Sequence, residues 1–551
     1  MDSIRSRRSA YLLFMIGITA VIYLQTARFS FLALDDTPLI VNNESMRHWS
    51  SLPTFFATDM WQGAHPGSLM YYRPLLLCWL LLNFKLFGLH GSLWHSAAVV
   101  LYLSGVLLAW RLAIKLTNNE LTAAAAALFF AVHPVHVESV AWLSAAVDPL
   151  LSVFCFGGFL AYFRWRENGR REWLIASGML VALSLFTKEA GAVLPVLIIL
   201  YELLFPARVE GSHSRRRWLA LAATVSIPVI VYVFARAMVL SSLVKMQDQR
   251  TWLDVVRMAP KLILIYLQQA VWPVHLAAAY DVRRIESASL VNFYLPLMIA
   301  LGFAALTVWA LLKKRAVGFF LLWWWVAIGP AIVGVLTFPE FDFAHDRYGF
   351  LGLYGLCFLG ASLLPLLPDS GGQMFGFPTT HSLALLCVTS VLAVLSVRQV
   401  EWWKSDIEMY KHAIEVSPRA IRPHGMLGNE YLKRGKFAEA LQLYRETVDL
   451  DPQNWRTNYA YAAALYRAGH LDESVTALAR TVQLNPKADV AYPLWAEILL
   501  RQGRNEEAVQ ILERGSEVVD DPHPLQEEII AIHSLKNLNG QNLNGPETKK
   551  R

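Results

Sequence analysis

The sequence predicts an all-α protein in two parts, a polytopic bundle of membrane helices followed by a solenoid of short helical repeats. Hydrophobic residues make up 55% of the 551 residues and charged residues only 17%, against about 25% charged residues in ordinary soluble domains. Apolar runs recur up to residue 400, and the chain beyond it repeats every 34 residues. This pattern excludes a soluble globular enzyme, a disordered chain and a collagen-like fibre. The predicted parts are a membrane domain over 1–400, a repeat domain over 401–536 and a disordered tail over 537–551.

Eleven membrane spans are predicted, because a span needs about 20 mostly apolar residues. The first run follows basic residues, as the core of a signal peptide does, but it lacks a small-residue cleavage site and is interpreted as a retained span. A further apolar segment, 258–275, contains Lys261, two glutamines and a proline, and it is predicted to be re-entrant or interfacial. The predicted spans are 9–27, 93–115, 121–138, 141–163, 172–187, 190–205, 218–240, 291–312, 316–336, 348–367 and 381–400.

Basic residues predict the orientation of this bundle. With eleven spans, the clusters of arginine and lysine between them all fall on one side, which the positive-inside rule makes the cytoplasmic side. The opposite, outer face then receives the whole repeat domain and the loops that carry most of the other ionisable residues. The net charge of +6 thus reflects membrane topology, and no nucleic-acid partner is expected. The basic clusters are at 5–8, 111–115, 164–171, 208–217 and 313–315.

The period of 34 residues after residue 400 is the signature of tetratricopeptide repeats, which are helix–turn–helix units. Small residues let the paired helices pack closely, and a proline ends the second helix of each pair. Stacked units offer a concave surface for a peptide or an acceptor protein, although a purely structural cap has the same signature. The repeating positions are Pro418, Pro452 and Pro486 at the helix ends and Gly435, Gly469 and Gly503 in the turns.

Two adjacent carboxylates, Asp35 and Asp36, follow the first span at the outer membrane edge, in the segment LDDTPLIVNN. Ionisable residues at a membrane are costly, which makes them functional candidates. One carboxylate can deprotonate a hydroxyl as a general base while the other orients that hydroxyl or shifts the pKa of the base. Two alternatives stay open, a divalent-cation site and a helix N-cap beside a solvated neighbour.

Three basic residues on the predicted outer face are candidates for binding a phosphate, namely Arg73, Lys188 and Arg347. Arginine binds phosphate through a planar fork of donors and lysine as a point charge. Each has a structural alternative. Arg73 can anchor a surface helix over 70–88. Lys188 can form a buried ion pair with Glu189, and Arg347 can lie in a solvated loop.

A second set of acidic and histidine residues lies in two segments of the outer face, 133–148 and 338–349. In the first segment the spacing resembles a set of metal ligands, but Pro134 disturbs the helical facing, and a pair of histidines is more often structural. We therefore predict no metal and no cofactor. The set comprises His133, His136, Glu138 and Asp148 in the first segment and His345 and Asp346 in the second, which also contains Glu340 and Asp342.

A carboxylate base, cations for a phosphate and a membrane-embedded groove together suit a sugar that is linked to a lipid phosphate. The base would activate an acceptor hydroxyl, and the lipid phosphate would leave with its charge stabilised by arginine and lysine. Neither a GxGxxG motif after a strand nor a GxxxxGK(S/T) motif occurs, so no soluble nucleotide site competes with this interpretation.

The sequence resembles the transmembrane and tetratricopeptide-repeat O-mannosyltransferases and, more broadly, the membrane glycosyltransferases of the GT-C fold. The resemblance implies a GT-C-like core of about eleven spans and an active site on the outer face. It also implies a polyprenyl- or dolichyl-phosphate-linked mannose donor and transfer to Ser or Thr of an acceptor protein. The matching segments are LDDTPLIVNN, YYRPLLLCWLLLNFKLFG, FFAVHPVHVESVAWLSAAVD, LFTKEAGAVLPVLIILYELL, HDRYGFLGLYG and WWKSDIEMYKHAIEVSPRAIRPHGMLGNEYL.

The same resemblance implies roles for individual residues. Asp35 would be the catalytic base, with Asp36 as runner-up. Arg73, Lys188 and Arg347 would take the phosphate-side roles. The chain departs from the family in two places, because the family often has GRAD where this chain has SAAVD, and because the repeat array is short. The short array points to a bacterial inner-membrane homologue with periplasmic repeats, the alternative being an endoplasmic reticulum protein with repeats in the lumen.

We therefore predict an inverting membrane glycosyltransferase whose repeats present or recruit the acceptor. The lipid-linked sugar, the acceptor protein and membrane lipid are its expected partners. The main alternative is a membrane-anchored tetratricopeptide-repeat scaffold without catalysis, which predicts that Asp35→Asn is tolerated. A flippase or transporter of lipid-linked intermediates predicts ionisable residues in mid-span, whereas most lie at outer edges here. A polymer ligase that acts on lipid-linked glycans has the same sequence features.

Overall fold

The computed structural model describes most of the chain as α-helix, in two compact units. They are Met1–Val416, here called the membrane unit, and Ser417–Arg551, here called the repeat unit. The strands of the described part are β1 (Gln373–Met374) and β2 (Phe377–Pro378), which form one short antiparallel hairpin. The all-α prediction is thereby confirmed. The described residues are 2–63, 71–206, 212–240, 250–338, 343–369, 371–375 and 377–543.

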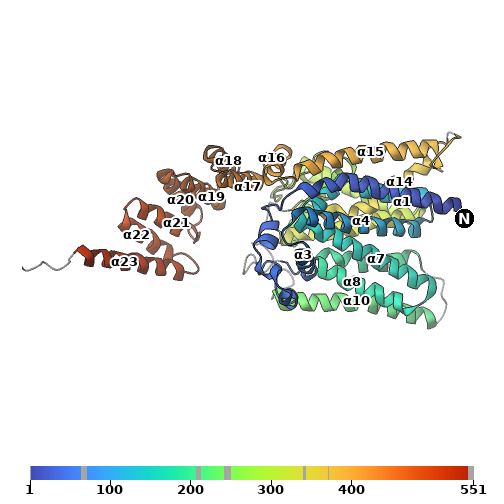
Figure 1. Cartoon of the computed structure of the whole chain (residues 1–551), viewed down its shortest axis with the longest axis horizontal. Helices are drawn as coiled ribbons and strands as arrows, with labels where there is room; N and C mark the ends of the chain where they lie inside the picture. Colours follow the sequence, from blue (N-terminus) through green and yellow to red (C-terminus); the bar gives the residue numbers. More distant parts are fainter. Residues whose placement is uncertain are drawn as a thin grey trace, which may run out of the picture. The chain divides into compact units, whose positions relative to one another are not determined.

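The membrane unit is a bundle in which long helices pack side by side, as Figure 1 shows for α1, α4 and α15. Its most extensive helix contacts are those of α7 with α8, α13 with α14, and α5 with α14, followed by those of α4 with α5 and with α7. The helices are α1 (Asp2–Tyr23), α2 (Leu52–Phe55), α3 (Pro74–Phe87), α4 (Gly91–Thr117), α5 (Glu120–Val132), α6 (Val137–Ala141), α7 (Val147–Asn168), α8 (Arg171–Thr187), α9 (Val193–Leu204), α10 (Ser212–Leu240), α11 (Trp252–Val271), α12 (Leu295–Lys313), α13 (Arg315–Val333), α14 (Phe350–Leu363), α15 (Thr379–Trp402) and α16 (Asp406–Val416).

Eight described helices are long and apolar enough to cross a membrane, and a ninth span results if α5 and the segment Pro134–Ala141, bent by 48°, count as one. Length and composition thus support eight or nine spans where eleven were predicted. The difference has a physical cause. Helix α8 has 17 residues and α9 only 12, and at about 1.5 Å per residue α9 is about 18 Å long, against a hydrocarbon core of about 30 Å. The eight helices are α1, α4, α7, α10, α12, α13, α14 and α15.

The segment between α5 and α7 is broken into short helical pieces and is buried throughout. Pro134 stands at the first position of a 3-10 turn, where its missing N–H costs nothing. A second 3-10 turn, Leu143–Ala146, leads into α7. These breaks bring several polar side chains into the interior at one end of α5 and α7, where the site described below lies.

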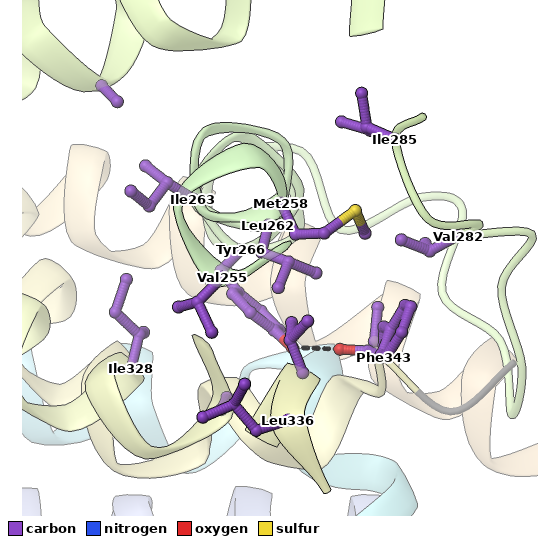
Figure 2. Packing of buried hydrophobic residues seen from close by; sticks show 14 of the residues in the cluster. Val255, Met258, Leu262, Ile263, Tyr266, Val282, Ile285, Ile328, Leu336 and Phe343 are labelled. Carbon is purple, nitrogen blue, oxygen red and sulfur yellow. Dashed lines mark hydrogen bonds between the residues drawn. The ribbon is translucent and has the colours of Figure 1, made fainter. Parts of the chain in front are cut away.

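A hydrophobic core fixes the segment that precedes α14 (Figure 2). Leu262 and Tyr266 of α11 pack with Ile328 of α13 and with Phe343. The hydroxyl of Tyr266 donates a hydrogen bond to the backbone oxygen of Phe343 at 3.4 Å. Because Phe343 is held in this way, the residues that follow it, up to Arg347, enter the interior at a defined place.

The repeat unit consists of antiparallel helix pairs. Gly435, Gly469 and Gly503 have φ angles of 73°, 86° and 77°, which a residue with a Cβ adopts only with strain. Each ends the first helix of a pair, so the turns predicted from the 34-residue period are confirmed. The predicted tail includes 537–543, which continues the last helix, while 544–551 lie outside the described residues. The helices are α17 (Ile421–Lys433), α18 (Phe437–Leu450), α19 (Trp455–Arg467), α20 (Leu471–Leu484), α21 (Ala491–Arg501), α22 (Asn505–Ser516) and α23 (His523–Leu543).

Candidate active site

Asp36 is fully buried and fixes the loop that leaves the first span, residues 29–36, here called the acidic loop. Its Oδ2 accepts a hydrogen bond from the backbone N–H of Leu32 at 3.0 Å. Its Oδ1 accepts two from Ser144, one from the backbone N–H at 2.8 Å and one from the hydroxyl at 2.6 Å. Burial raises the pKa of Asp36 to about 7, although these donors act to lower it. Asp36 therefore ties the acidic loop to the 3-10 turn before α7.

Asp35 is only partly buried and is close enough to Arg347 to act on its charge. Its backbone oxygen accepts a hydrogen bond from the N–H of Leu39 at 3.0 Å, in the single helical turn that follows the acidic loop. Both Asp35 and Asp148 act electrostatically on the guanidinium of Arg347. Both oxygens of Asp36 accept hydrogen bonds from fixed donors, so Asp36 holds the acidic loop in place next to Asp35.

Arg73, which precedes α3, is paired with Glu189 in the segment between α8 and α9. Its Nη2 and Nε donate to Oε2 of Glu189 at 2.9 and 3.1 Å, and Arg236 of α10 donates to Oε1 at 3.0 Å. The Arg73 guanidinium also lies 4.5 Å from the centre of the Tyr71 ring. Burial alone would raise the pKa of Glu189, but the two arginines lower it to about 2. An ionised Glu189 thus holds two guanidinium groups together.

Lys188 is buried, and its Nζ lies 2.6 Å from Oδ1 of Asp148 in α7. The suggested pair between Lys188 and its neighbour Glu189 is therefore not the one that the structure forms. Burial lowers the pKa of Lys188, Asp148 raises it, and Arg73 and Arg347 lower it further. Both arginines are thus close enough to repel the charge of Lys188.

Arg347, at the start of the α14 span, is paired with Glu138 of α6, which is 209 residues away in the sequence. Oε2 of Glu138 accepts a hydrogen bond from the backbone N–H of Arg347 at 2.9 Å, and Oε1 accepts one from its guanidinium. Nδ1 of His345 lies 3.6 Å from the same Oε1. The guanidinium lies 4.9 Å from the centre of the Trp142 ring and 5.2 Å from that of Tyr348. Arg347 therefore lies in the interior and not in a solvated loop.

The three basic residues that the sequence singled out thus meet in one place. Nζ of Lys188 lies 5.7 Å from the centre of the Tyr348 ring, so Lys188 and Arg347 share one aromatic neighbour. Arg73 and Arg347 both act on Lys188, and Asp35 acts on Arg347. A carboxylate and three cations from four distant segments of the chain therefore form a single electrostatic neighbourhood at one end of the bundle.

The other members of the second acidic and histidine set have separate partners. Nε2 of His133 donates to a backbone oxygen of α11 at 3.0 Å, and Nδ1 of His136 lies 2.7 Å from the hydroxyl of Tyr102. Oδ1 of Asp346 accepts hydrogen bonds from Gln269 at 3.0 Å and from a tyrosine hydroxyl. Among the described residues, no three His, Cys, Asp or Glu side chains lie close enough to hold a metal ion together. Glu340 and Asp342 lie outside the described residues.

Two residues of this site were not singled out from the sequence. Arg236 lies inside the predicted span 218–240, and an arginine within an apolar run is costly enough to mark a candidate site, so a signal existed. Ser144 carried no such signal, because a serine beside a membrane helix is ordinary. Its role becomes visible only when the fold brings it to Asp36, 108 residues away.

Comparisons with known proteins agree with the two-part organisation. Residues 72–235 match the family model of dolichyl-phosphate-mannose-protein mannosyltransferases. This match contains Arg73, Glu138, Asp148 and Lys188. Residues 431–493 and 496–514 match models of the tetratricopeptide repeat.

Curated relatives belong to the protein O-mannosyl-transferases. TMTC1 of Mus musculus is 30% identical over 212 residues, which are 36% of this chain and 22% of that protein. Tmtc1 of Drosophila melanogaster is 31% identical over 207 residues, which are 36% of this chain and 23% of that protein. A protein O-mannosyl-transferase of Caenorhabditis elegans is 24% identical over 449 residues, 77% of this chain and 60% of that protein. The chain thus spans less than two thirds of the length of each of these relatives.

The likeness to solved structures is weaker. ArnT from Cupriavidus metallidurans in the apo state is 14% identical, covers 86% of this chain and 80% of its own, and has a TM-score of 0.38. The sequence relatives confirm the predicted resemblance. The chain is a multi-pass integral membrane protein similar to the protein O-mannosyl-transferases, and the segment that matches the mannosyltransferase family model lies ahead of its tetratricopeptide repeats.

Proposed function

We propose that the protein is a membrane glycosyltransferase that moves a sugar from a polyprenyl- or dolichyl-phosphate carrier to a Ser or Thr hydroxyl of an acceptor protein. The observation that carries the proposal is the meeting of Arg73, Lys188 and Arg347 beside Asp35. These residues come from four separate segments, and their charges act on one another. Mannose is the proposed sugar, because the relatives are protein O-mannosyl-transferases.

The proposed reaction is a single displacement with inversion. The carboxylate of Asp35 takes the proton of the acceptor hydroxyl, whose oxygen forms a new bond to the anomeric carbon of the sugar. The bond from that carbon to the phosphate oxygen breaks, and the lipid phosphate leaves with the bonding electrons. Cations fixed in advance stabilise this leaving group without reorganising at the moment of reaction. Lys188 and Arg347 both lie near the ring of Tyr348, and Arg73 and Arg347 both act on the charge of Lys188, so the three cations are the proposed phosphate ligands.

Each of the three cations has a carboxylate partner in the structure, and these partners fit the proposal. Glu189, Asp148 and Glu138 hold the charges of Arg73, Lys188 and Arg347 in position. A buried cation without such a partner would lose its charge or its place. In this proposal the three carboxylates act as positioning groups for the three cations.

The repeat unit is proposed to bind the acceptor, and both it and the acidic loop are proposed to face the outer side of the membrane. In a bacterial cell this side is the periplasm, and in the endoplasmic reticulum it is the lumen. Stacked helical repeats present an extended surface suited to a peptide. This part of the proposal is independent of the identity of the base.

Sugar transfer in proteoliposomes tests the proposal. The full-length protein would receive polyprenyl-phosphate-mannose and a Ser/Thr-rich peptide, in parallel with Asp35→Asn and Asp36→Asn variants. Loss of a general base lowers kcat by about 10²- to 10⁴-fold, and we expect this loss for Asp35→Asn at an unchanged thermal midpoint. In Asp36→Asn one carboxylate oxygen is replaced by an amide N–H₂ group, which faces an N–H or O–H donor and cannot accept its hydrogen bond. This variant is therefore expected to lower both the transfer rate and the thermal midpoint.

Glu44→Gln is the matched control, because Glu44 lies in the same outer loop with its side chain 78% exposed and paired with Arg47. It should transfer at the wild-type rate. Undiminished transfer by both aspartate variants would refute the carboxylate base. A wild-type protein that transfers no sugar from any lipid-phosphate donor would instead favour the membrane-anchored repeat scaffold.

A further inference from the structure

The start of α16 contacts the acidic loop. Oδ1 of Asp406, the first residue of α16, accepts a hydrogen bond from the backbone N–H of Ala33 at 2.9 Å, across 373 residues of sequence. Ala33 stands two residues before Asp35. The preceding N–H, that of Leu32, donates to Asp36. Two consecutive N–H groups of the acidic loop are thus held by carboxylates, one from inside the loop and one from α16.

The same stretch of chain contacts the basic side of the site. Trp403 is buried, and its ring is stacked on that of Trp142 with 6.2 Å between the ring centres and 19° between the planes. The guanidinium of Arg347 lies 4.9 Å from the centre of the Trp142 ring. Four residues, from Trp403 to Asp406, therefore reach both the loop of the proposed base and the ring that contacts a proposed phosphate ligand.

This stretch is itself held firmly. The ring of Trp402 is stacked on that of His412 in α16, with 4.4 Å between the ring centres and 2° between the planes. Nε2 of His412 donates to the backbone oxygen of Leu276 at 2.9 Å, and the side chain of Gln399 in α15 donates to the same oxygen at 3.2 Å. The end of α15 and the body of α16 are thus attached to one carbonyl, which leaves Asp406 little freedom to move.

We infer that Asp406 is a positioning residue, which sets the place of Asp35 through the N–H of Ala33. A displacement of a reacting group by about 1 Å costs up to about 100-fold in rate. Because Ala33 is two residues before Asp35, a shift of the Ala33 backbone is expected to move Asp35 as well. The inference about Asp35 rests on the proposed function, whereas the ordering of the acidic loop by Asp406 does not.

Amide hydrogen exchange of the full-length protein in nanodiscs tests the ordering. In Asp406→Ala the peptide that contains Ala33 should exchange about tenfold faster, as expected for the loss of one hydrogen bond. Asp406→Asn keeps an oxygen that accepts from Ala33, so its exchange should stay close to wild type. Glu408→Ala is the control, because it removes a carboxylate from the same turn of α16.

Kinetics of the same variants test the effect on Asp35. Asp406→Ala should lower kcat for sugar transfer by about 10- to 100-fold, while KM for the lipid-linked donor and the thermal midpoint stay at wild-type values. Asp406→Asn should restore most of kcat. The pH profile of Asp406→Asn should match that of the wild type, because the proposed effect works through a hydrogen bond and not through the charge of Asp406.

Two results would overturn the inference, namely unchanged exchange of the acidic loop in Asp406→Ala, and an Asp406→Asn variant as impaired as Asp406→Ala. Should the alanine variant not fold, Asp406→Glu takes its place, since it keeps the charge but displaces the acceptor by one methylene, and faster exchange is expected. A wild type without transfer activity refutes the proposed function alone. In that case the exchange of the acidic loop still decides whether Asp406 orders it.

Discussion

Two lysine–aspartate pairs, one in each unit, have the same Nζ–Oδ1 distance of 2.6 Å. The side chains of Lys188 and Asp148 in the membrane unit are 9% and 3% exposed, whereas those of Lys487 and Asp520 in the repeat unit are 62% and 84% exposed. Equal distance does not mean equal energy, because the attraction between charges falls as the surrounding dielectric constant rises. The comparison therefore separates the geometry of an ion pair from its environment.

The ion pairs of the two units also differ in how far they reach along the chain. Arg73 and Glu189 are 116 residues apart. In the repeat unit, pairs such as Lys433–Glu430 and Arg501–Glu497 are three or four residues apart on one helix. Such local pairs stabilise a helix by about 0.2–0.5 kcal/mol. The ion pairs of the candidate site thus join distant segments of the membrane unit, while many pairs of the repeat unit join neighbours on one helix.

Asp148→Asn is expected to have the largest effect on stability. It leaves the buried Lys188 without its counter-charge, and breaking a buried pair in this way costs about 3–5 kcal/mol. Thermal or denaturant unfolding of the purified protein in one detergent would measure this loss. The result should hardly depend on salt, because buried pairs are poorly screened.

A double variant sharpens this prediction. Lys188→Met combined with Asp148→Leu replaces the pair by apolar side chains, a change that is often neutral or stabilising. It should regain most of the stability that Asp148→Asn loses, without regaining sugar transfer, because the cation is gone. An Asp148→Asn protein as stable as the wild type would contradict the interpretation of this pair as a buried, mutually dependent one.

The pH dependence of stability tests the buried carboxylate of the acidic loop. Burial raises the pKa of Asp36 from 3.8 to about 7, so the folded state binds a proton that the unfolded state has released. The wild type should therefore lose stability as pH rises from about 4 to about 7. One unit of pKa difference corresponds to about 1.4 kcal/mol, which makes the slope measurable by unfolding across that interval.

Two variants control this experiment. The asparagine of Asp36→Asn cannot titrate. The stability of this variant should therefore fall less than that of the wild type as pH rises from about 4 to about 7. Ser144→Ala removes the hydroxyl donor that acts to lower the pKa of Asp36, so its slope should extend to higher pH. Equal slopes for the wild type and Asp36→Asn would show that Asp36 does not titrate in this range.

The same contrast between local and distant contacts explains what could be predicted from the sequence. The turns at Gly435, Gly469 and Gly503 follow from a period that repeats along the chain and were predicted correctly. The all-α class and the membrane helices follow from apolar runs in the same way. The number of spans was less well predicted, because the runs 172–187 and 190–205 were counted as spans although each is shorter than the about 20 residues that a span needs.

The candidate site could be predicted only in part. Costly charges at membrane edges singled out Asp35, Arg73 and Arg347, but not the partners that these charges have. The pairing of Glu138 with Arg347 spans 209 residues, and no local pattern encodes such a distance. Partner choice follows from packing in three dimensions, which is why the predicted pair of Lys188 with Glu189 gave way to Lys188 with Asp148.

Asp520→Asn, which breaks the exposed pair of the repeat unit, is expected to have the smallest effect on stability. Lys487 and Asp520 are largely surrounded by water, and exposed pairs contribute about 0.2–1 kcal/mol. Amide exchange of the turn between α22 and α23 in the full-length protein would report the change at low salt and at about 1 M salt, where the screening length falls to about 3 Å. The difference from wild type should be small at low salt and vanish at high salt. A loss as large as that of Asp148→Asn would mean that distance, and not burial, sets the energy of these pairs.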